Sequence, residues 1–208
     1  GADAVRWALL SSSVPGQGTR FSEEFARDAT RDLLLKIWNV TSFFVTYANL
    51  DGWTPKIENA ELRIEKDAGS SSSQFSTLNS QFQPIDRWAL AELNRVITEV
   101  LAAYEAYEFH NVYRALFNFS TVTLSARYFD IIKDRLYTFA PRNKARRSAQ
   151  TALLEIADAL ARMLGPILVF TADEIWENLP DRAEPSIHLA LLPKAEEESH
   201  EALLSEWE

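Results

Sequence analysis

The chain has 208 residues, of which 47% are hydrophobic and 25% are charged, so it can bury a core of its own and is typical of a globular protein. It contains no cysteine, which excludes disulfides, thiol nucleophiles and cysteine-ligated zinc within these residues. The formal net charge of −9 is unfavourable for binding nucleic acid, because affinity for phosphates comes from Lys and Arg. No apolar run approaches the roughly 18 to 20 residues that cross a bilayer.

The charge is distributed unevenly along the chain. Residues 173–208 contain 11 acidic and 2 basic residues, whereas residues 1–172 contain 19 of each and are neutral. Within the neutral part, residues 127–147 carry seven basic residues against two acidic ones. This segment is the best candidate in the sequence for contact with a polyanion.

The first elements of the chain read as helices. Residues 1–12 predict a short helix, followed by a loop rich in Ser, Pro and Gly at residues 13–20. Ser22 is suited to cap a second helix that is expected to run to about Asn49. Apolar residues recur there every three or four positions and form one stripe: Phe25, Ala29, Leu33, Ile37, Val40, Phe44 and Ala48.

Arg27, Arg31 and Trp38 project from nearly the opposite side of this second helix, at about 100° per residue. Two interpretations remain open for them. In one, Trp38 packs on a neighbouring helix and the two arginines are solvated. In the other, all three side chains meet RNA, by phosphate contact and by stacking on a base or sugar.

The middle of the chain predicts a break followed by two long helices. Periodicity fades over residues 54–83, which we interpret as a linker or surface insertion. Pro84 begins a third helix, and a fourth begins near Glu108 and ends before Pro141. The apolar stripe of the third helix is Ile85, Trp88, Leu93, Val96, Val100 and Tyr104. That of the fourth is Phe109, Tyr113, Leu116, Ser120, Leu124, Tyr128 and Ile131.

The last third of the chain begins with a basic loop, residues 142–147. A fifth helix is expected to follow it and to end at Leu164, before a Gly-Pro pair. Thr171 and Glu174 have the spacing of a capping box, which predicts a short helix ending at Pro180. The acidic end is expected to form a last weak helix or to be disordered. Strand signals are nearly absent, so the sequence predicts an all-α, up-and-down helical bundle.

Nothing in the sequence supports catalysis or metal binding. The Gly-Gln-Gly at residues 16–18 lacks the remaining residues of a phosphate-binding loop. Ser11 to Ser13 have no nearby His to activate them, and no two His have the spacing of a helical metal pair. We therefore expect no catalytic residue, no metal ligand and no cofactor within this chain.

Several short segments along the chain form an ordered series of motifs. The first are GADAVRW at residues 1–7, LKIWN at 35–39 and DRWAL at 86–90, and they resemble segments of the class I aminoacyl-tRNA synthetases for branched aliphatic amino acids. The later ones are closer to bacterial isoleucyl-tRNA synthetases: YEAYEFH at 104–110, YFDIIKDRLY at 128–137, RRSAQTAL at 146–153 and PILVFTADEIW at 166–176. The valyl and leucyl enzymes share the first motifs, and they remain an alternative.

The resemblance implies a helical anticodon-binding region of the class Ia type, with tRNA and the catalytic domain of the same parent chain as partners, in the cytoplasm and not in a membrane. Residues 1–20 would be the connector that follows the KMSKS loop, residues 21–180 the anticodon-binding domain, and residues 181–208 an acidic extension. ATP, Mg²⁺ and often Zn²⁺ would belong to the rest of an enzyme that charges tRNA with isoleucine. The chain itself would carry no catalytic machinery.

Two groups of residues are the candidate tRNA contacts. Arg31, Trp38 and Asn39 lie on the second helix, although Ser42 and Phe43 stand where many relatives have Arg. The basic loop supplies Arg142, Lys144, Arg146 and Arg147. The DRW and ADEIW segments are assigned to packing and capping. A helical protein-interaction module with an acidic tail is the alternative from another class, and a broad apolar patch in place of a basic-aromatic face would favour it.

Overall fold

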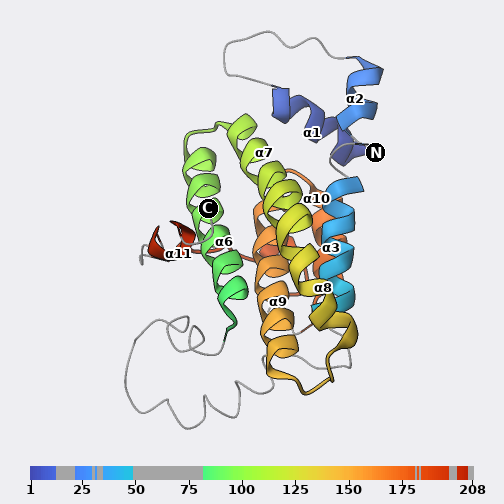
Figure 1. Cartoon of the computed structure of the whole chain (residues 1–208). Coiled ribbons are helices and arrows are strands. Elements are labelled where there is room, and N and C mark those ends of the chain that lie inside the picture. The colour runs from blue at the N-terminus through green and yellow to red at the C-terminus, as the bar shows by residue number, and fades with distance from the viewer. Residues whose placement is uncertain are drawn as a thin grey trace.

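The structure is a computed structural model that describes residues 1–12, 22–29, 31, 35–48, 82–180, 182, 184–196 and 201–205. Within these residues the chain forms helices and no strand, and the longer helices run up and down beside one another (Figure 1). The predicted all-α bundle is therefore confirmed. Its α-helices are α1 (Ala2–Ser12), α2 (Glu23–Ala29), α3 (Leu35–Ala48), α6 (Pro84–Glu105), α7 (Phe109–Asn118), α8 (Phe129–Thr138), α9 (Lys144–Leu164), α10 (Val169–Glu177) and α11 (Glu201–Ser205).

The centre of the bundle is α9, which contacts α3, α6, α8 and α10. Its buried residues lie on more than one side of the helix, as expected for an element enclosed by others. Many of them are alanines, whose small side chains allow close approach of neighbouring helices: Ala149, Ala152, Ala157, Ala159 and Ala161. Leu153 and Ile156 are fully buried, and each contributes roughly 1.5–3 kcal/mol by leaving water.

The third predicted helix is confirmed as α6. Pro84 lies in its first turn, where the missing N–H of proline has no helical partner to lose. The predicted apolar stripe is buried apart from Tyr104, which is partly exposed. The Tyr104 hydroxyl donates to the carbonyl oxygen of Met163 at 2.7 Å, and this bond ties the end of α6 to the end of α9.

The fourth predicted helix spans the expected residues but is not α-helical throughout. A π-helix, η3 (Phe119–Tyr128), lies between α7 and α8. The extra residues per turn of a π-helix rotate the buried face, so the predicted stripe holds as far as Tyr128 and then shifts by one position. Ile132 is buried, whereas Ile131 is 43% exposed, so the assignment of Ile131 to the core was wrong.

The first helix is anchored to α10 by a buried carboxylate. Asp3 Oδ2 accepts hydrogen bonds from the backbone nitrogen and the hydroxyl of Thr171, both at 2.8 Å. Because α10 begins at Val169, Thr171 lies inside the helix, and the predicted capping box at Thr171 was wrong. Asp3 instead satisfies an otherwise unpaired N–H of the first turn of α10. Trp7 packs against Tyr113 of α7, with ring centroids 4.9 Å apart.

The second predicted helix includes α2 and α3 among the described residues. The expected cap is confirmed, since Ser22 Oγ accepts from the Phe25 nitrogen at 3.1 Å. Ile37 and Val40 of the predicted stripe are buried. Residues 30 and 32–34, between α2 and α3, lie outside the described residues. The expected helix end at Asn49 and residues 54–81 of the proposed linker lie outside them too.

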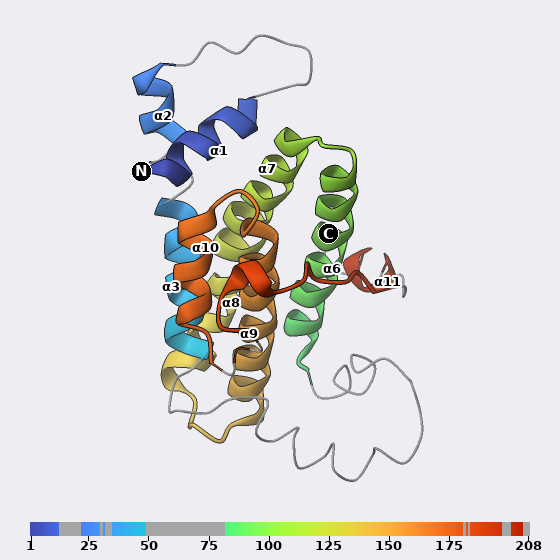
Figure 2. The ribbon, with the colours of Figure 1, turned by 180° about the vertical axis from the view of Figure 1, so that it is seen from behind.

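The C-terminal part crosses the bundle as an extended strap, residues 190–196, between the short 3-10 helix η4 (Ile187–Leu189) and α11 (Figure 2). The side-chain amide of Asn94 holds both polar groups of the Glu196 backbone, with the Glu196 nitrogen donating to Oδ1 at 2.7 Å. This pairing fixes the strap to α6. No helix in the described part of the chain is long and apolar enough to cross a membrane.

Candidate nucleic-acid interface

The α8–α9 turn, residues 139–143, lies at the end of the bundle far from α1 (Figure 1). Arg142 in this turn and Lys144, the first residue of α9, are both exposed. Neither forms an ion pair with any residue that the structure describes. Asn143 caps the helix between them, because its Oδ1 accepts from the Ala145 nitrogen at 2.9 Å. The two cations therefore project from a fixed helix start.

The start of α9 concentrates positive charge. The N-terminus of a helix carries a partial positive charge, which acidic residues usually offset. No acidic residue lies in the first turn of α9, where Lys144 adds a further positive charge. Such an arrangement is unfavourable for the isolated helix, whereas exposed backbone N–H groups and adjacent cations suit a phosphate.

Two of the four predicted phosphate contacts in the basic segment have other roles. The prediction of a loop through residue 147 was wrong, because α9 begins at Lys144. Arg146 is only 6% exposed and donates to the carbonyl oxygen of Phe139 at 2.6 Å, so it closes the turn from inside. Arg147 is half-buried and donates to Gln150 Oε1 at 2.7 Å. Arg146 is therefore removed from the candidate contact surface.

Aromatic rings of α3 and α8 pack against each other along these helices. Tyr47 packs edge to face on Tyr137, close to the turn, with centroids 5.2 Å apart, whereas Phe43 stacks on Phe129 at the far end of α8, at 4.3 Å. Tyr137 is 57% exposed and Phe139 is 40% exposed, so both offer ring surface to solvent. A hydrogen bond to Tyr137 and partial burial raise the pKa of the Tyr47 phenol. The α8–α9 end of the bundle thus carries the exposed rings of Tyr137 and Phe139 as well as two cations, Arg142 and Lys144, without an ion-pair partner among the described residues.

The second predicted group, Arg31, Trp38 and Asn39, is not part of this cluster. Trp38 is 41% exposed, Asn39 is exposed, and the exposed Arg31 forms an ion pair with Asp28 at 3.1 Å. The carbonyl oxygen of Tyr47 accepts from Gln150 Nε2 at 3.1 Å, which places the end of α3 beside the start of α9. Trp38 comes nine residues earlier, which is about 13 Å along the helix axis. The structure therefore separates the two groups along α3.

Trp38 lines a hollow of about 290 Å³ between α3 and α10. Its other lining residues are Thr41, Ser42, Val45, Thr46, Glu174, Ile175 and Asn178. Among the residues that the structure describes, no cation lines this hollow, so they offer a ring and polar groups but no positive charge for a phosphate. The exposed face of Trp38 is suited to stacking on a base. Its contact with RNA stays a prediction.

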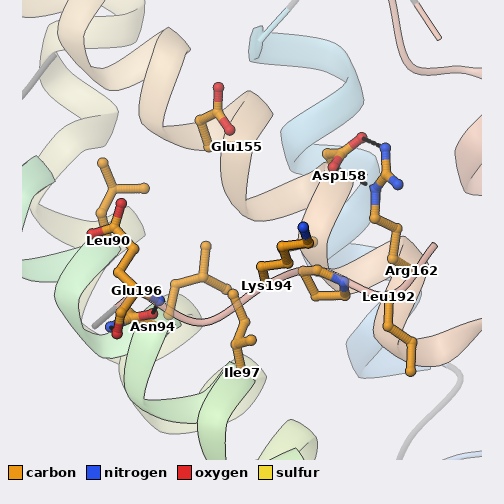
Figure 3. A pocket seen from close by; sticks show the side chains of 12 residues that line it. Leu90, Asn94, Ile97, Glu155, Asp158, Arg162, Leu192, Lys194 and Glu196 are labelled. Atoms are coloured by element: carbon orange, nitrogen blue, oxygen red, sulfur yellow. Dashed lines mark hydrogen bonds and ion pairs between the residues drawn. The ribbon is translucent and has the colours of Figure 1, made fainter. Parts of the chain in front are cut away.

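A second hollow, of about 300 Å³, lies between α6, α9 and the strap (Figure 3). Its floor includes Leu90 and Ile97, and its lining carries the carboxylates of Glu155, Asp158 and Glu196. Arg162 is engaged there in two contacts with Asp158, at 2.7 and 3.2 Å, and donates to the Leu191 carbonyl oxygen at 3.0 Å. The acidic lining is unsuited to a polyanion.

The DRW and ADEIW segments have internal roles. Asp86 is fully buried and accepts from Tyr128, Arg135 and Ser148. Burial raises the pKa of its carboxyl, although these donors and the charge of Arg135 act in the opposite direction. In the second segment, Asp173 Oδ1 accepts from the Ser186 hydroxyl at 2.8 Å and from the Ile187 nitrogen at 3.1 Å, and buried Trp176 donates to the Glu184 carbonyl oxygen at 2.9 Å.

The exposed rings of Tyr137 and Phe139, and the role of Tyr47, were not among the predicted contacts. Their residue types suit RNA, but Tyr47 and Tyr137 are 90 positions apart in the chain and only the fold brings them together. No group of His, Asp and Glu that could hold a metal ion occurs among the residues that the structure describes.

Comparison with known proteins gives a consistent result. A family profile described as the anticodon-binding domain of tRNA ligase matches residues 86–208. The chain is 51% identical over 123 residues to an isoleucine–tRNA ligase of Carboxydothermus hydrogenoformans, covering 59% of this chain and 13% of that protein. It is 37% identical over 198 residues to the isoleucine–tRNA ligase of Natranaerobius thermophilus, covering 95% and 19%. The chain thus spans less than a fifth of the length of these relatives.

Proposed function

Because the chain belongs to the anticodon-binding domain family of tRNA ligases and matches isoleucine–tRNA ligases over most of its length, we propose that it holds the anticodon stem and loop of an isoleucine-accepting tRNA. The parent would be a cytoplasmic isoleucine–tRNA ligase that uses ATP and Mg²⁺, and in some cases Zn²⁺, outside these residues. In this proposal the chain itself supplies binding and orientation, not chemistry.

The phosphate contacts are assigned to Arg142 and Lys144. Both are exposed, neither has a carboxylate partner among the described residues, and both lie at the N-terminal end of α9. Arg147 lies one turn further along and contributes to the same field, while its side chain also contacts Gln150. Phosphate contacts of this kind set the register of an RNA on a protein but carry no sequence information.

Stacking contacts are assigned to the aromatic rings beside this turn. Tyr137 and Phe139 expose enough ring surface for an unpaired base or a ribose to pack on them. Trp38, with Asn39 next to it on α3, would form a second contact about 13 Å along α3 from Tyr47, and Arg31, which precedes α3, is assigned to the same contact. An RNA stem that lies along α3 could reach both groups.

The observation that carries the proposal is a pair of exposed cations, Arg142 and Lys144, that have no carboxylate partner in the described part of the chain and lie at the start of α9 near exposed aromatic rings. The test compares the double variant Arg142→Ala/Lys144→Ala with the unchanged chain in binding isoleucine-accepting tRNA at several salt concentrations. Removing two phosphate contacts should weaken binding and reduce the slope of log K against log salt by roughly 0.7–0.9 for each contact.

The matched control is the double variant Arg95→Ala/Arg114→Ala, which removes two exposed arginines from α6 and α7. It should leave the salt slope near that of the unchanged chain. If Arg142→Ala/Lys144→Ala binds tRNA with unchanged affinity and slope at low salt, the proposed interface is wrong. Binding of an unrelated tRNA with equal affinity would show that these contacts supply affinity without selectivity.

A further inference from the structure

A single carboxylate links the two helices that carry the α8–α9 turn. Asp86 lies in the first turn of α6 and is fully buried. Its Oδ2 accepts from Arg135 Nη1 at 3.2 Å, in the last turn of α8, and from the hydroxyl of Ser148, in the second turn of α9. One oxygen atom therefore holds both helices close to the point where the turn connects them.

The other oxygen of Asp86 serves a different element. Asp86 Oδ1 accepts from the Tyr128 hydroxyl at 2.8 Å, and Tyr128 ends the π-helix η3. The Ser148 hydroxyl also accepts from the Gln83 nitrogen at 2.9 Å, which adds the start of α6 to the same network. Asp86 Oδ2 thus holds α8 and α9 beside the turn, whereas Oδ1 holds η3.

A buried charge is seldom the most stable choice for a core position. Replacing such a group and its partners with well-packed apolar residues is often neutral or stabilising, because burial removes the carboxylate from water. What the Asp86 network adds is a fixed geometry, since three donors of defined direction converge on one side chain. The residues whose placement depends on this geometry are those of the turn, including Arg142 and Lys144.

We propose that Asp86 is a positioning residue for tRNA binding: by holding Arg135 and Ser148 it fixes the α8–α9 turn so that Arg142 and Lys144 meet the phosphate backbone together. This inference rests on the proposed function. A turn held in its binding geometry loses less conformational freedom when RNA binds, which increases affinity without any new contact. Arg146 supports the same arrangement from within the turn through its bond to Phe139.

The experiment uses three single variants of the chain. Asp86→Asn and Ser148→Ala weaken or remove the hydrogen bonds by which Asp86 Oδ2 holds α8 and α9. Tyr128→Phe removes one hydrogen bond from the other oxygen of the same carboxylate. For each variant, tRNA affinity is measured at several salt concentrations, well below its melting temperature. Asp86→Asn and Ser148→Ala should weaken tRNA binding by roughly three- to tenfold and flatten the salt dependence, since the two cations no longer bind as a pair.

Tyr128→Phe should lower the melting temperature while its salt slope remains that of the unchanged chain. The inference is overturned if Asp86→Asn and Ser148→Ala keep the full slope, or if Tyr128→Phe flattens it equally. If Asp86→Asn does not fold, Ser148→Ala decides alone, because it removes only a hydroxyl. Failure of the proposed function is distinguishable, since then Arg142→Ala/Lys144→Ala would also leave tRNA binding unchanged.

Discussion

The α8–α9 end of the bundle leaves an arginine exposed beside engaged ones, whereas the face of α9 under the strap, called here the C-terminal face, engages its arginine. On the C-terminal face, Arg162 contacts Asp158 and the Leu191 carbonyl oxygen, and its guanidinium lies 4.9 Å from the centre of the Trp176 ring. At the α8–α9 end, Arg142 is exposed and has no carboxylate partner among the described residues. The same residue type therefore holds the chain together in one region and faces solvent in the other.

This difference is compatible with the proposed binding of tRNA by a chain whose net charge is −9. Long-range fields between exposed charges fade beyond about 8 Å at physiological salt, so carboxylates farther than this from the α8–α9 turn have little influence on its cations. What matters locally is whether a cation is neutralised by a neighbouring carboxylate. The comparison predicts that engaged cations contribute to stability and unpaired ones to binding.

The largest expected effect comes from a buried arginine of the basic segment. Arg146→Met should lower the free energy of unfolding by about 1–3 kcal/mol, because the Phe139 carbonyl oxygen loses the donor that the buried Arg146 side chain supplies. Arg142→Met, four residues away and exposed, should change it by no more than about 0.5 kcal/mol. Urea denaturation measures both, and equal losses would contradict the division between engaged and unpaired cations.

On the C-terminal face, Arg162→Met should cost about 1–2 kcal/mol of unfolding free energy. The substitution removes the ion pair with Asp158 and the bond to Leu191 of the strap while keeping some contact with Trp176. Affinity for tRNA, measured at a temperature where both proteins are folded, should not change. Weaker tRNA binding with an unchanged salt slope would indicate that the strap also touches RNA.

Much of the fold could be predicted because helical periodicity is local. The stripe of α6 and the break at residues 165–166 depend on residues close in sequence, and the structure bears them out. The π-helix could not be predicted in this way, and it moved the buried position from Ile131 to Ile132. The start of α10 was missed for a similar reason, since one N–H of its first turn, that of Thr171, is satisfied by Asp3, 168 positions earlier.

The next prediction compares the contributions of two exposed side chains, Tyr137 at the α8–α9 end and Leu191 on the strap, to tRNA affinity. Tyr137→Leu should weaken tRNA binding by about 1–2 kcal/mol, since stacking of a base on an aromatic ring has this magnitude. Leu191→Ala is the control, because Leu191 is 78% exposed and lies on the strap, not at the α8–α9 end. It should leave binding unchanged. Equal effects of the two substitutions would remove the reason for assigning stacking to the α8–α9 end.

The candidate site was predictable only in part, because sequence indicates which charges are present but not which are engaged. Residues 142–147 were identified from their basic residues alone, and that criterion does not distinguish exposed Arg142 from buried Arg146. The distinction depends on a hydrogen bond across the turn. Trp38, in contrast, was placed on the exposed side of its helix by periodicity, and it is 41% exposed.

The smallest expected effect is a difference in how the two regions respond to acid. Hydrogen bonds from Ser186 and Ile187 lower the pKa of Asp173, so the stability it provides is present above the ordinary carboxyl value of 3.8 and is lost as pH falls through the folded value. Burial raises the pKa of Asp86, so the unfolded chain releases this proton at a lower pH than the folded chain does. The contribution of Asp86 to the free energy of unfolding therefore declines as pH rises above 3.8. The free energy of unfolding of Asp173→Asn and Asp86→Asn is compared with that of the unchanged chain from pH 7 to pH 3. The deficit of Asp173→Asn should shrink as pH falls, and that of Asp86→Asn should grow. Parallel trends would show that the two carboxylates do not differ in this way, and that the contrast between the regions is confined to their cations.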